Sequence, residues 1–196
     1  NGQMTQFTIQ LDQSTYQPGA TCRRHLIASV AAPEPAALAE RTPLDLALVI
    51  DTSGSMAQGR LEYAKRAAAG VVEALLPEDR LTVVAFESNV HTLVDNLPME
   101  GTGRDRALDA IGQLQTMGRT NLSGGWLAGG AILADAASEA SERRRQIVLL
   151  SDGHANEGIV EPDLLAQKAR RLLERGVPTS CVGVGNGYST IQLEAI

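Results

Sequence analysis

The chain has 196 residues, of which 43% are hydrophobic, enough for one domain with an appendage and a buried core. Its formal net charge of -6 and isoelectric point near 5.1 argue against nucleic acid or an anionic membrane as the main partner, because phosphate contacts need clustered lysine and arginine. No stretch reaches the length of a transmembrane helix, so we expect no membrane insertion by this chain.

Residues 1–43 predict a short β segment followed by a linker. Residues 7–11 alternate apolar and polar side chains, the period of a half-buried strand. Pro18-Gly19 marks a turn, and residues 22–30 continue the two-residue period on one face, so we expect a β hairpin or a pair of sandwich strands. Prolines then bracket a linker over residues 33–43.

Residues 44–196 predict an α/β domain: a doubly wound, mostly parallel sheet flanked by helices, in a Rossmann-like arrangement. Apolar strands alternate with amphipathic helices throughout this stretch. The expected strands are 44–50, 81–86, 147–150 and 179–184, with 90–94 as a short antiparallel edge. The expected helices are 61–75, 108–114, 126–137 and 164–175. Another helix starts at 191, so we expect a final helix and strand to follow residue 196.

Several conspicuous residues receive structural interpretations. Trp126 lies on the apolar stripe of a predicted helix, which favours core packing. Arg143-Arg144-Arg145 lies at the expected end of a helix, where cations stabilise the helix dipole. Cys22 and Cys181 lack metal or redox spacing; Cys181 is expected in the core, and its pairing with Cys22 stays open. These cysteines leave both a cytoplasmic and a secreted or surface-attached location open.

A set of oxygen-bearing side chains follows the strand at 44–50. Residues 51–55 read Asp-Thr-Ser-Gly-Ser, and open α/β sheets bind ligands outside the carboxyl ends of their strands. Alternation along the turn lets Asp51, Ser53 and Ser55 point the same way, and the intervening glycine permits a tight backbone path. An oxygen-only set suits a hard divalent cation such as Mg2+ or Mn2+.

Two further loops carry the same chemistry, at residues 118–125 and 151–158. The second follows a strand directly, so Asp152 should emerge at the same sheet edge as Asp51. Thr120 joins them if its loop folds over that edge. Each residue alone would be read as a helix cap or a turn residue, but five of them converging on one edge favour metal binding.

Together these three segments resemble the von Willebrand factor A domain family, whose metal-ion-dependent adhesion site combines D-x-S-x-S with a threonine and an aspartate from two further loops. The resemblance covers residues 44–196 and implies a metal site formed by Asp51, Ser53, Ser55, Thr120 and Asp152. In this family the hydroxyls contact the ion, while the two carboxylates act directly or through water. Such a site leaves the ion short of negative charge, so it favours an anionic outside ligand. The implied ligand is a Glu or Asp side chain of a partner protein, as in cell adhesion.

Two other functions stay open. One is a von Willebrand A subunit that docks on an ATP-driven, chelatase-like complex with the same metal site. The other is a Mg2+-dependent phosphoryl-transfer enzyme with Asp51 as nucleophile, but Ser53 stands where dehalogenase-like phosphatases have their second aspartate. Lys65 and Lys168 lie on predicted helices, and no base is evident to activate Ser53 or Ser55. We therefore expect a binding module without catalysis.

The remaining candidates receive structural interpretations. The glycine-rich segment 183–187 lacks the full spacing of a dinucleotide loop and is interpreted as a turn. His154 is expected to be solvated, and His25 and His91 to be structural or exposed. Strands that precede a von Willebrand A module also occur in chains that resemble inter-alpha-trypsin inhibitor heavy chains, and the N-terminal β segment is similar to these.

Overall fold

The computed structural model describes residues 6–11, 19, 25–31, 41–135 and 143–196 of the chain. The chain divides into two compact units, Asn1–Arg41 and Thr42–Ile196.

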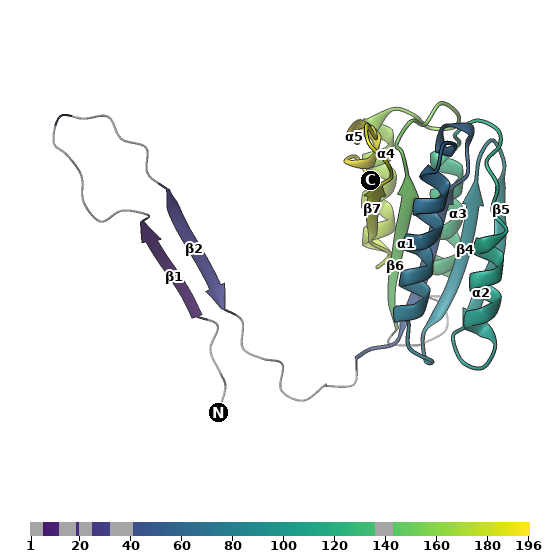
Figure 1. Ribbon diagram of the computed structural model, residues 1–196, viewed down its shortest axis with the longest axis horizontal. Helices are drawn as coiled ribbons and strands as arrows, with labels where there is room; N and C mark the ends of the chain where they lie inside the picture. Colours follow the sequence, from purple (N-terminus) through teal and green to yellow (C-terminus); the bar gives the residue numbers. More distant parts are fainter. Residues whose placement is uncertain (1–5, 12–18, 20–24, 32–40, 136–142) are drawn as a thin grey trace. The chain divides into compact units, whose positions relative to one another are not determined.

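The N-terminal unit contains the predicted antiparallel strand pair, β1 (Gln6–Leu11) and β2 (Leu26–Ala31) (Figure 1). Its register pairs Phe7 with Val30, Ile9 with Ala28, and Leu11 with Leu26. Strand alternation therefore gathers these apolar side chains on one face. The expected half-burial is wrong, since Phe7 is 59% and Leu26 66% exposed. The reason is that, within the described residues of this unit, no second layer covers the two strands. Cys22 lies outside the described residues.

The second unit is built on one five-stranded sheet with the order β5-β4-β3-β6-β7. Its strands are β3 (Leu44–Asp51), β4 (Arg80–Phe86), β5 (Val90–Pro98), β6 (Arg144–Ser151) and β7 (Thr179–Gly183). All neighbours pair in parallel except β5, which runs antiparallel to β4. This confirms the predicted mostly parallel sheet and its antiparallel edge, although β5 is longer than expected.

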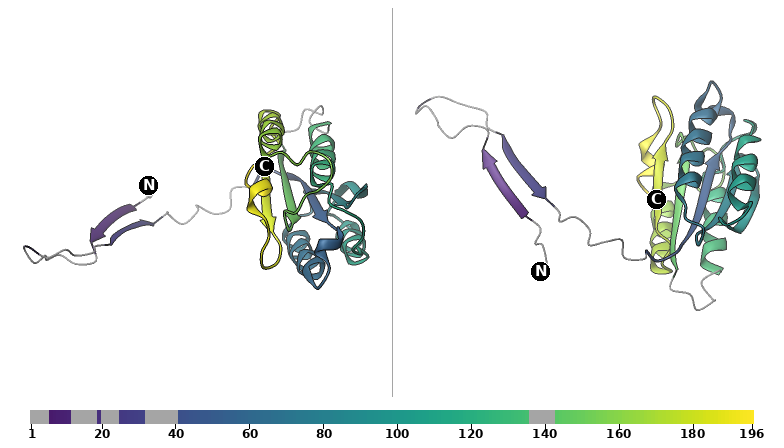
Figure 2. Two further views of the ribbon diagram at one scale, coloured as in Figure 1. Left: turned by 90° about the horizontal axis from the view of Figure 1, so that it is seen from above. Right: turned by 60° about the horizontal axis from the view of Figure 1, so that its bottom comes forward.

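Helices cover both faces of this sheet (Figure 2). They are α1 (Arg60–Ala74), α2 (Gly103–Gly112), α3 (Leu122–Asp135), α4 (Pro162–Glu174) and the short α5 (Thr190–Leu193). The helix predicted to reach Leu114 ends at Gly112, yet Leu114 is still buried. None of the helices in the described part of the chain is long and apolar enough to cross a membrane.

The central strand β3 is buried on both faces and divides the core in two. Leu46, Leu48 and Ile50 pack in the cluster that includes α1 and α2. Ala47 and Val49 pack in the cluster that includes α3 and α4. The near-continuous apolar run of β3 follows from this double burial, since each alternate side chain meets a helix layer.

Strand register places two of the three candidate loops at one edge of the sheet. Asp51, the last residue of β3, lies opposite Phe86, the last residue of β4. Ile50 lies opposite Leu150, so β6 ends beside β3 at Ser151. The segments that follow β3, β4 and β6 therefore leave the sheet side by side, as expected for parallel strands.

Trp126 packs in the core, as predicted. Its side chain is fully buried, and its Nε1 donates a hydrogen bond of 3.0 Å to Thr179 Oγ1. The bond satisfies the polar end of the indole, which a buried tryptophan requires. Gly183 is the last residue of β7, and residues 185–187 form the turn predicted for this segment.

The arginine run at 143–145 does not end a helix, contrary to the prediction. Arg144 begins β6, because it pairs with Leu44 at the start of β3. Arg143 Nε instead contacts Asp45 Oδ1 at 2.6 Å. Arg145 Nη1 donates a hydrogen bond of 3.3 Å to the carbonyl of Arg175, so it caps the C-terminal end of α4 rather than the helix that precedes it.

Glycines let α3 lie close to the sheet. A Cβ atom added at Gly125 would overlap the ring of Phe86, and one at Gly129 would lie 2.8 Å from Val49 Cγ2. Because α3 directly follows the loop that carries Thr120, this close packing fixes the position of that loop.

We predict that Gly125→Ala lowers the free energy of unfolding by about 1–3 kcal/mol, because the added methyl forces the Phe86 ring to move. Gly70→Ala in α1 is the matched control, since nothing lies within 4 Å of its added Cβ. It should raise stability by about 0.5–1 kcal/mol, as alanine favours a helix over glycine. Urea unfolding of both variants measures this, and a loss of stability at Gly70 equal to that at Gly125 would contradict it.

Candidate metal centre

Asp51 is fully buried at the end of β3. Its Oδ1 accepts a hydrogen bond of 2.9 Å from the backbone N–H of Ser53, and its Oδ2 accepts one of 2.6 Å from Ser151 Oγ. Burial raises the pKa of Asp51, and the charge of Asp152 acts in the same direction, while the hydrogen bonds from Ser151 and Ser53 oppose the rise. A nearby cation would therefore stabilise the ionised form of this carboxyl group.

Ser53 and Ser55 present their hydroxyls to one another, as the alternation along the turn predicts. Their Oγ atoms are 3.0 Å apart, in a segment that includes the short 3-10 helix η1 (Gly54–Met56). Ser53 is buried and Ser55 is exposed, so the pair extends from the sheet edge to the surface.

The loop that carries Thr120 is bound to both other loops. Gly54 N–H donates to the carbonyl of Gly118 at 3.2 Å, which links it to the loop after β3. Thr120 N–H donates to Asn156 Oδ1 at 3.0 Å, and Asn156 N–H donates back to the carbonyl of Thr120 at 3.1 Å. Thr120 is thereby held at the sheet edge, where it is 2% exposed.

Asp152 is fully buried in the loop after β6. Its Oδ1 accepts a hydrogen bond of 3.2 Å from His154 N–H and lies 3.3 Å from His154 Nδ1. Its Oδ2 accepts a hydrogen bond of 3.1 Å from Arg60 Nη1. The His154 side chain is 50% exposed, in line with the expected solvated loop residue, and its ring also lies against Asp152.

The structure thus joins the three predicted loops pairwise at one edge of the sheet. The five predicted residues lie in these loops: Asp51, Ser53, Ser55, Thr120 and Asp152. Among the described residues, no group of three or more His, Cys, Asp or Glu side chains is placed to hold a metal ion. The predicted set differs from such groups because it combines two carboxylates with three hydroxyls, and these hard oxygen donors fit a divalent cation.

Several supporting residues were not predicted. Arg60, the first residue of α1, reaches the loop after β6, and Asn156 of that loop reaches the Thr120 loop. Ser151 adjoins the predicted aspartate, and its bond to Asp51 depends on the pairing of β3 with β6.

Glu87 supports the Thr120 loop from the strand β4 side. Its backbone carbonyl accepts a hydrogen bond of 2.8 Å from Asn121 N–H, and a Cβ atom at Gly118 would overlap its carboxylate. Its Oε1 accepts a hydrogen bond of 3.0 Å from Asn89 Nδ2 and lies 3.3 Å from His91 Nε2. These contacts, the Asn89 bond foremost, lower the pKa of Glu87 to about 2. His91 is 52% exposed and lies beside Glu87, which agrees with the expectation that it is structural or exposed.

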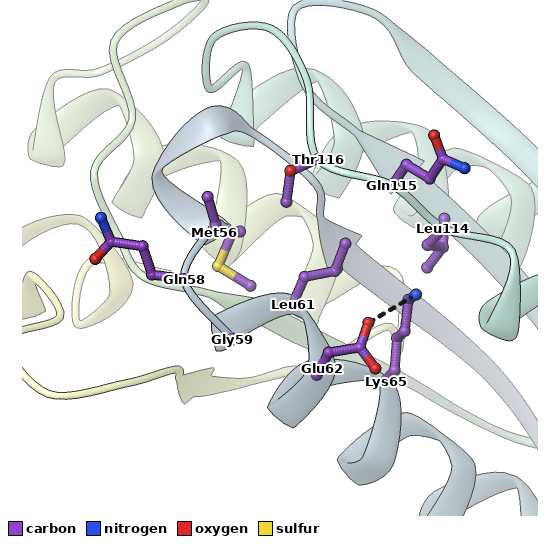
Figure 3. Close-up of a pocket in the computed structure, with 10 residues that line it drawn as sticks. Met56, Gln58, Gly59, Leu61, Glu62, Lys65, Leu114, Gln115 and Thr116 are labelled. Atoms are coloured by element: carbon purple, nitrogen blue, oxygen red, sulfur yellow. Dashed lines mark ion pairs between the residues drawn. The ribbon is translucent and has the colours of Figure 1, made fainter.

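A cavity of about 380 Å³ lies beside the Asp51–Ser55 loop (Figure 3). Met56, Leu61 and Leu114 give it an apolar lining, and all three are buried. The ion pair between Glu62 and Lys65, 2.9 Å long, lies at the same cavity. Met56 directly follows Ser55 in the chain, but none of the five predicted ligands lines the cavity.

The fold and the loop cluster define a von Willebrand A-like domain. The family model of the von Willebrand factor type A domain matches residues 46–154, more than half of the chain. The chain therefore belongs to the von Willebrand factor type A domain family.

Known proteins similar to the chain include a human relative, inter-alpha-trypsin inhibitor heavy chain H3. It is 32% identical over 157 residues, which cover 78% of this chain and 18% of the relative. The chain thus spans less than a fifth of that protein.

Two solved structures share the fold. A von Willebrand factor type A protein from Catenulispora acidiphila gives a TM-score of 0.61 at 21% identity, over 99% of this chain and 44% of that one. Proximal thread matrix protein 1 from the mussel byssus, solved with a zinc-occupied MIDAS motif, gives a TM-score of 0.64 at 18% identity, over 79% of this chain and 41% of that one.

Because the pKa of Glu87 is lowered in the folded protein, we predict that the free energy of unfolding decreases at acid pH. Because this pKa is about 2 in the folded protein against an ordinary 4.5, the unfolded chain takes up the proton first as the pH falls. The stability that ionised Glu87 contributes is thus complete above pH 4.5 and is lost as the pH falls toward about 2. Urea unfolding of the wild type and Glu87→Gln should show a stability difference that shrinks across this window. A difference independent of pH would contradict the assignment.

Proposed function

We propose that the chain is a divalent-metal-dependent protein-binding module. Asp51, Ser53, Ser55, Thr120 and Asp152 would hold one Mg2+ or Mn2+ ion, and an Asp or Glu side chain of a partner protein would complete its coordination. One observation carries the proposal: three loops with hard oxygen donors are hydrogen-bonded into one cluster at the carboxyl edge of the sheet. That edge is where open α/β sheets bind ligands.

The charge of the cluster explains why a partner carboxylate would bind. Three of the five donors are neutral hydroxyls, so the set carries at most two negative charges. The carboxylate of Asp51 already accepts two hydrogen bonds from the protein, and that of Asp152 is shared with Arg60. The positive charge of a divalent ion held there is only partly neutralised by these donors. The ion would therefore bind an incoming carboxylate more strongly than a neutral water molecule.

The same geometry disfavours catalysis by these residues. Asp51 is fully buried and has both oxygens in hydrogen bonds, so it is badly placed as a nucleophile. Ser53 Oγ has Ser55 Oγ as its partner rather than a base, and the His154 ring lies against Asp152. A hydroxyl without a neighbouring base stays a weak nucleophile. We therefore assign the site to binding and not to phosphoryl transfer.

Family membership and the similar structures add support. The mussel byssus protein shares the fold and carries zinc in a MIDAS motif, which is the class of site proposed for this chain. The cavity that Met56 helps to line lies beside the loop after β3, so it offers room for a partner side chain near that loop. The apolar lining of this cavity and its Glu62–Lys65 ion pair would contact partner side chains around the metal-bound carboxylate.

Removal of a proposed ligand should abolish metal uptake and leave the fold intact. Isothermal titration with Mg2+ is expected to show binding to the wild type and none to Asp51→Ala or Thr120→Ala. Asp51→Asn is included because its amide can keep the hydrogen bonds to Ser53 and Ser151 while losing the charge.

The matched controls are Asp95→Ala and Thr92→Ala, which remove the same side chains from exposed positions of β5. Both should bind Mg2+ like the wild type. Circular dichroism in EDTA checks that each variant is folded. Equal Mg2+ uptake by the wild type and the folded Asp51 variants would show that the ion is not held here.

A further inference from the structure

Arg60 places a fixed positive charge inside the candidate metal centre. It is the first residue of α1, and its Nη1 atom donates to two loops. One hydrogen bond, of 3.1 Å, goes to Asp152 Oδ2, and the other, of 2.9 Å, goes to the backbone carbonyl of Ser55. The side chain is 33% exposed, whereas its partner Asp152 is fully buried. A single guanidinium nitrogen thus bridges two of the loops that carry proposed ligands.

The rest of the Arg60 side chain is held along its length. A Cβ atom added at Gly185, in the turn after β7, would lie 3.0 Å from Arg60 Nε and 3.1 Å from its Cγ and Cδ atoms. The backbone of this turn therefore packs directly on the arginine side chain. Because Gly185 has a φ of +85°, the turn also needs glycine for its own conformation. These contacts with Ser55, Asp152 and Gly185 hold the Arg60 guanidinium in one position.

This charge changes the electrostatic balance of the proposed site. The two carboxylates carry two negative charges, and Arg60 cancels one of them. A bound divalent ion then leaves the cluster with an excess of one positive charge, whereas without Arg60 the charges would balance. Because like charges repel, Arg60 lowers the affinity of the site for the divalent ion. Once the ion is bound, the same excess positive charge attracts one carboxylate from outside.

We propose that Arg60 is a specificity-determining residue of this centre, which lowers its affinity for the divalent ion and raises the affinity of the loaded centre for a partner carboxylate. This inference rests on the proposed function. It predicts effects of opposite sign on two binding steps, whereas a residue that only holds Asp152 in place would weaken both steps when removed.

Manganese provides both readouts. Electron paramagnetic resonance of free Mn2+ measures ion binding, and water proton relaxation of the Mn2+-loaded protein measures the binding of acetate, the simplest carboxylate. Arg60→Gln should bind Mn2+ about tenfold more tightly than the wild type and, once loaded, bind acetate about tenfold more weakly. Arg60→Lys should restore both affinities, because one nitrogen makes both contacts of the arginine.

Two further variants control the experiment. Arg66→Gln removes the same charge from an exposed position of the same helix and should change neither affinity. Arg60→Met is a second neutral variant that keeps an unbranched chain against Gly185. Circular dichroism in EDTA checks folding, and if neither neutral variant folds, Arg60 is a structural residue and the inference is wrong.

The outcomes separate this inference from the function on which it rests. If the wild type binds Mn2+ but the neutral Arg60 variants bind it equally or more weakly, the role of Arg60 is wrong and the metal site stands. If those variants bind Mn2+ more tightly but bind acetate as well as the wild type, Arg60 does not set carboxylate affinity. If the wild type takes up no Mn2+, the proposed function and the inference both fail.

Discussion

The site depends on one buried carboxylate, that of Asp51 at the end of the central strand. Its two oxygens accept hydrogen bonds from the loop that follows β3 and from Ser151 at the end of β6, so the group joins two neighbouring strands at their carboxyl ends. Burial opposes its ionisation, and the two donors offset part of that cost. Because β3 is packed against helices on both faces, this carboxylate cannot move out to water without opening the core.

The other loops are arranged around this fixed group. The close packing of α3 on the sheet positions Thr120, and Glu87 supports the same loop from β4. Asp152 is held from two sides, by His154 of its own loop and by Arg60 of α1. Neutral hydroxyls, two carboxylates and one arginine thus make a compact polar cluster with little excess negative charge. This balance, more than any single donor, is what suits the proposed site to an anionic partner group.

The sequence was sufficient to predict the sheet, its antiparallel edge and the three loops, because apolar runs and oxygen-bearing turns are local signals. Contacts between distant segments were not predictable in this way. Arg60 and Asp152 are 92 positions apart, and Arg143 and Asp45 are 98 apart, so nothing in their local sequence shows that they meet. The Arg143 contact explains why a helix-capping role failed, since the strand pairing of β6 with β3 brings these two residues together. The exposure of β1 and β2 could not be predicted either. The alternation of apolar and polar residues shows which side chains share a face of the strand, but not whether another layer covers that face.

Anomalous diffraction from crystals soaked in Mn2+ and acetate would locate both the ion and its outside ligand. We expect one manganese peak at the carboxyl edge of β3, in contact with Ser53, Ser55 and Thr120, and an acetate oxygen on the side of the ion that faces solvent. A peak at another place, or an ion at this edge enclosed by protein ligands alone, would contradict the claim that the centre recruits a carboxylate from outside.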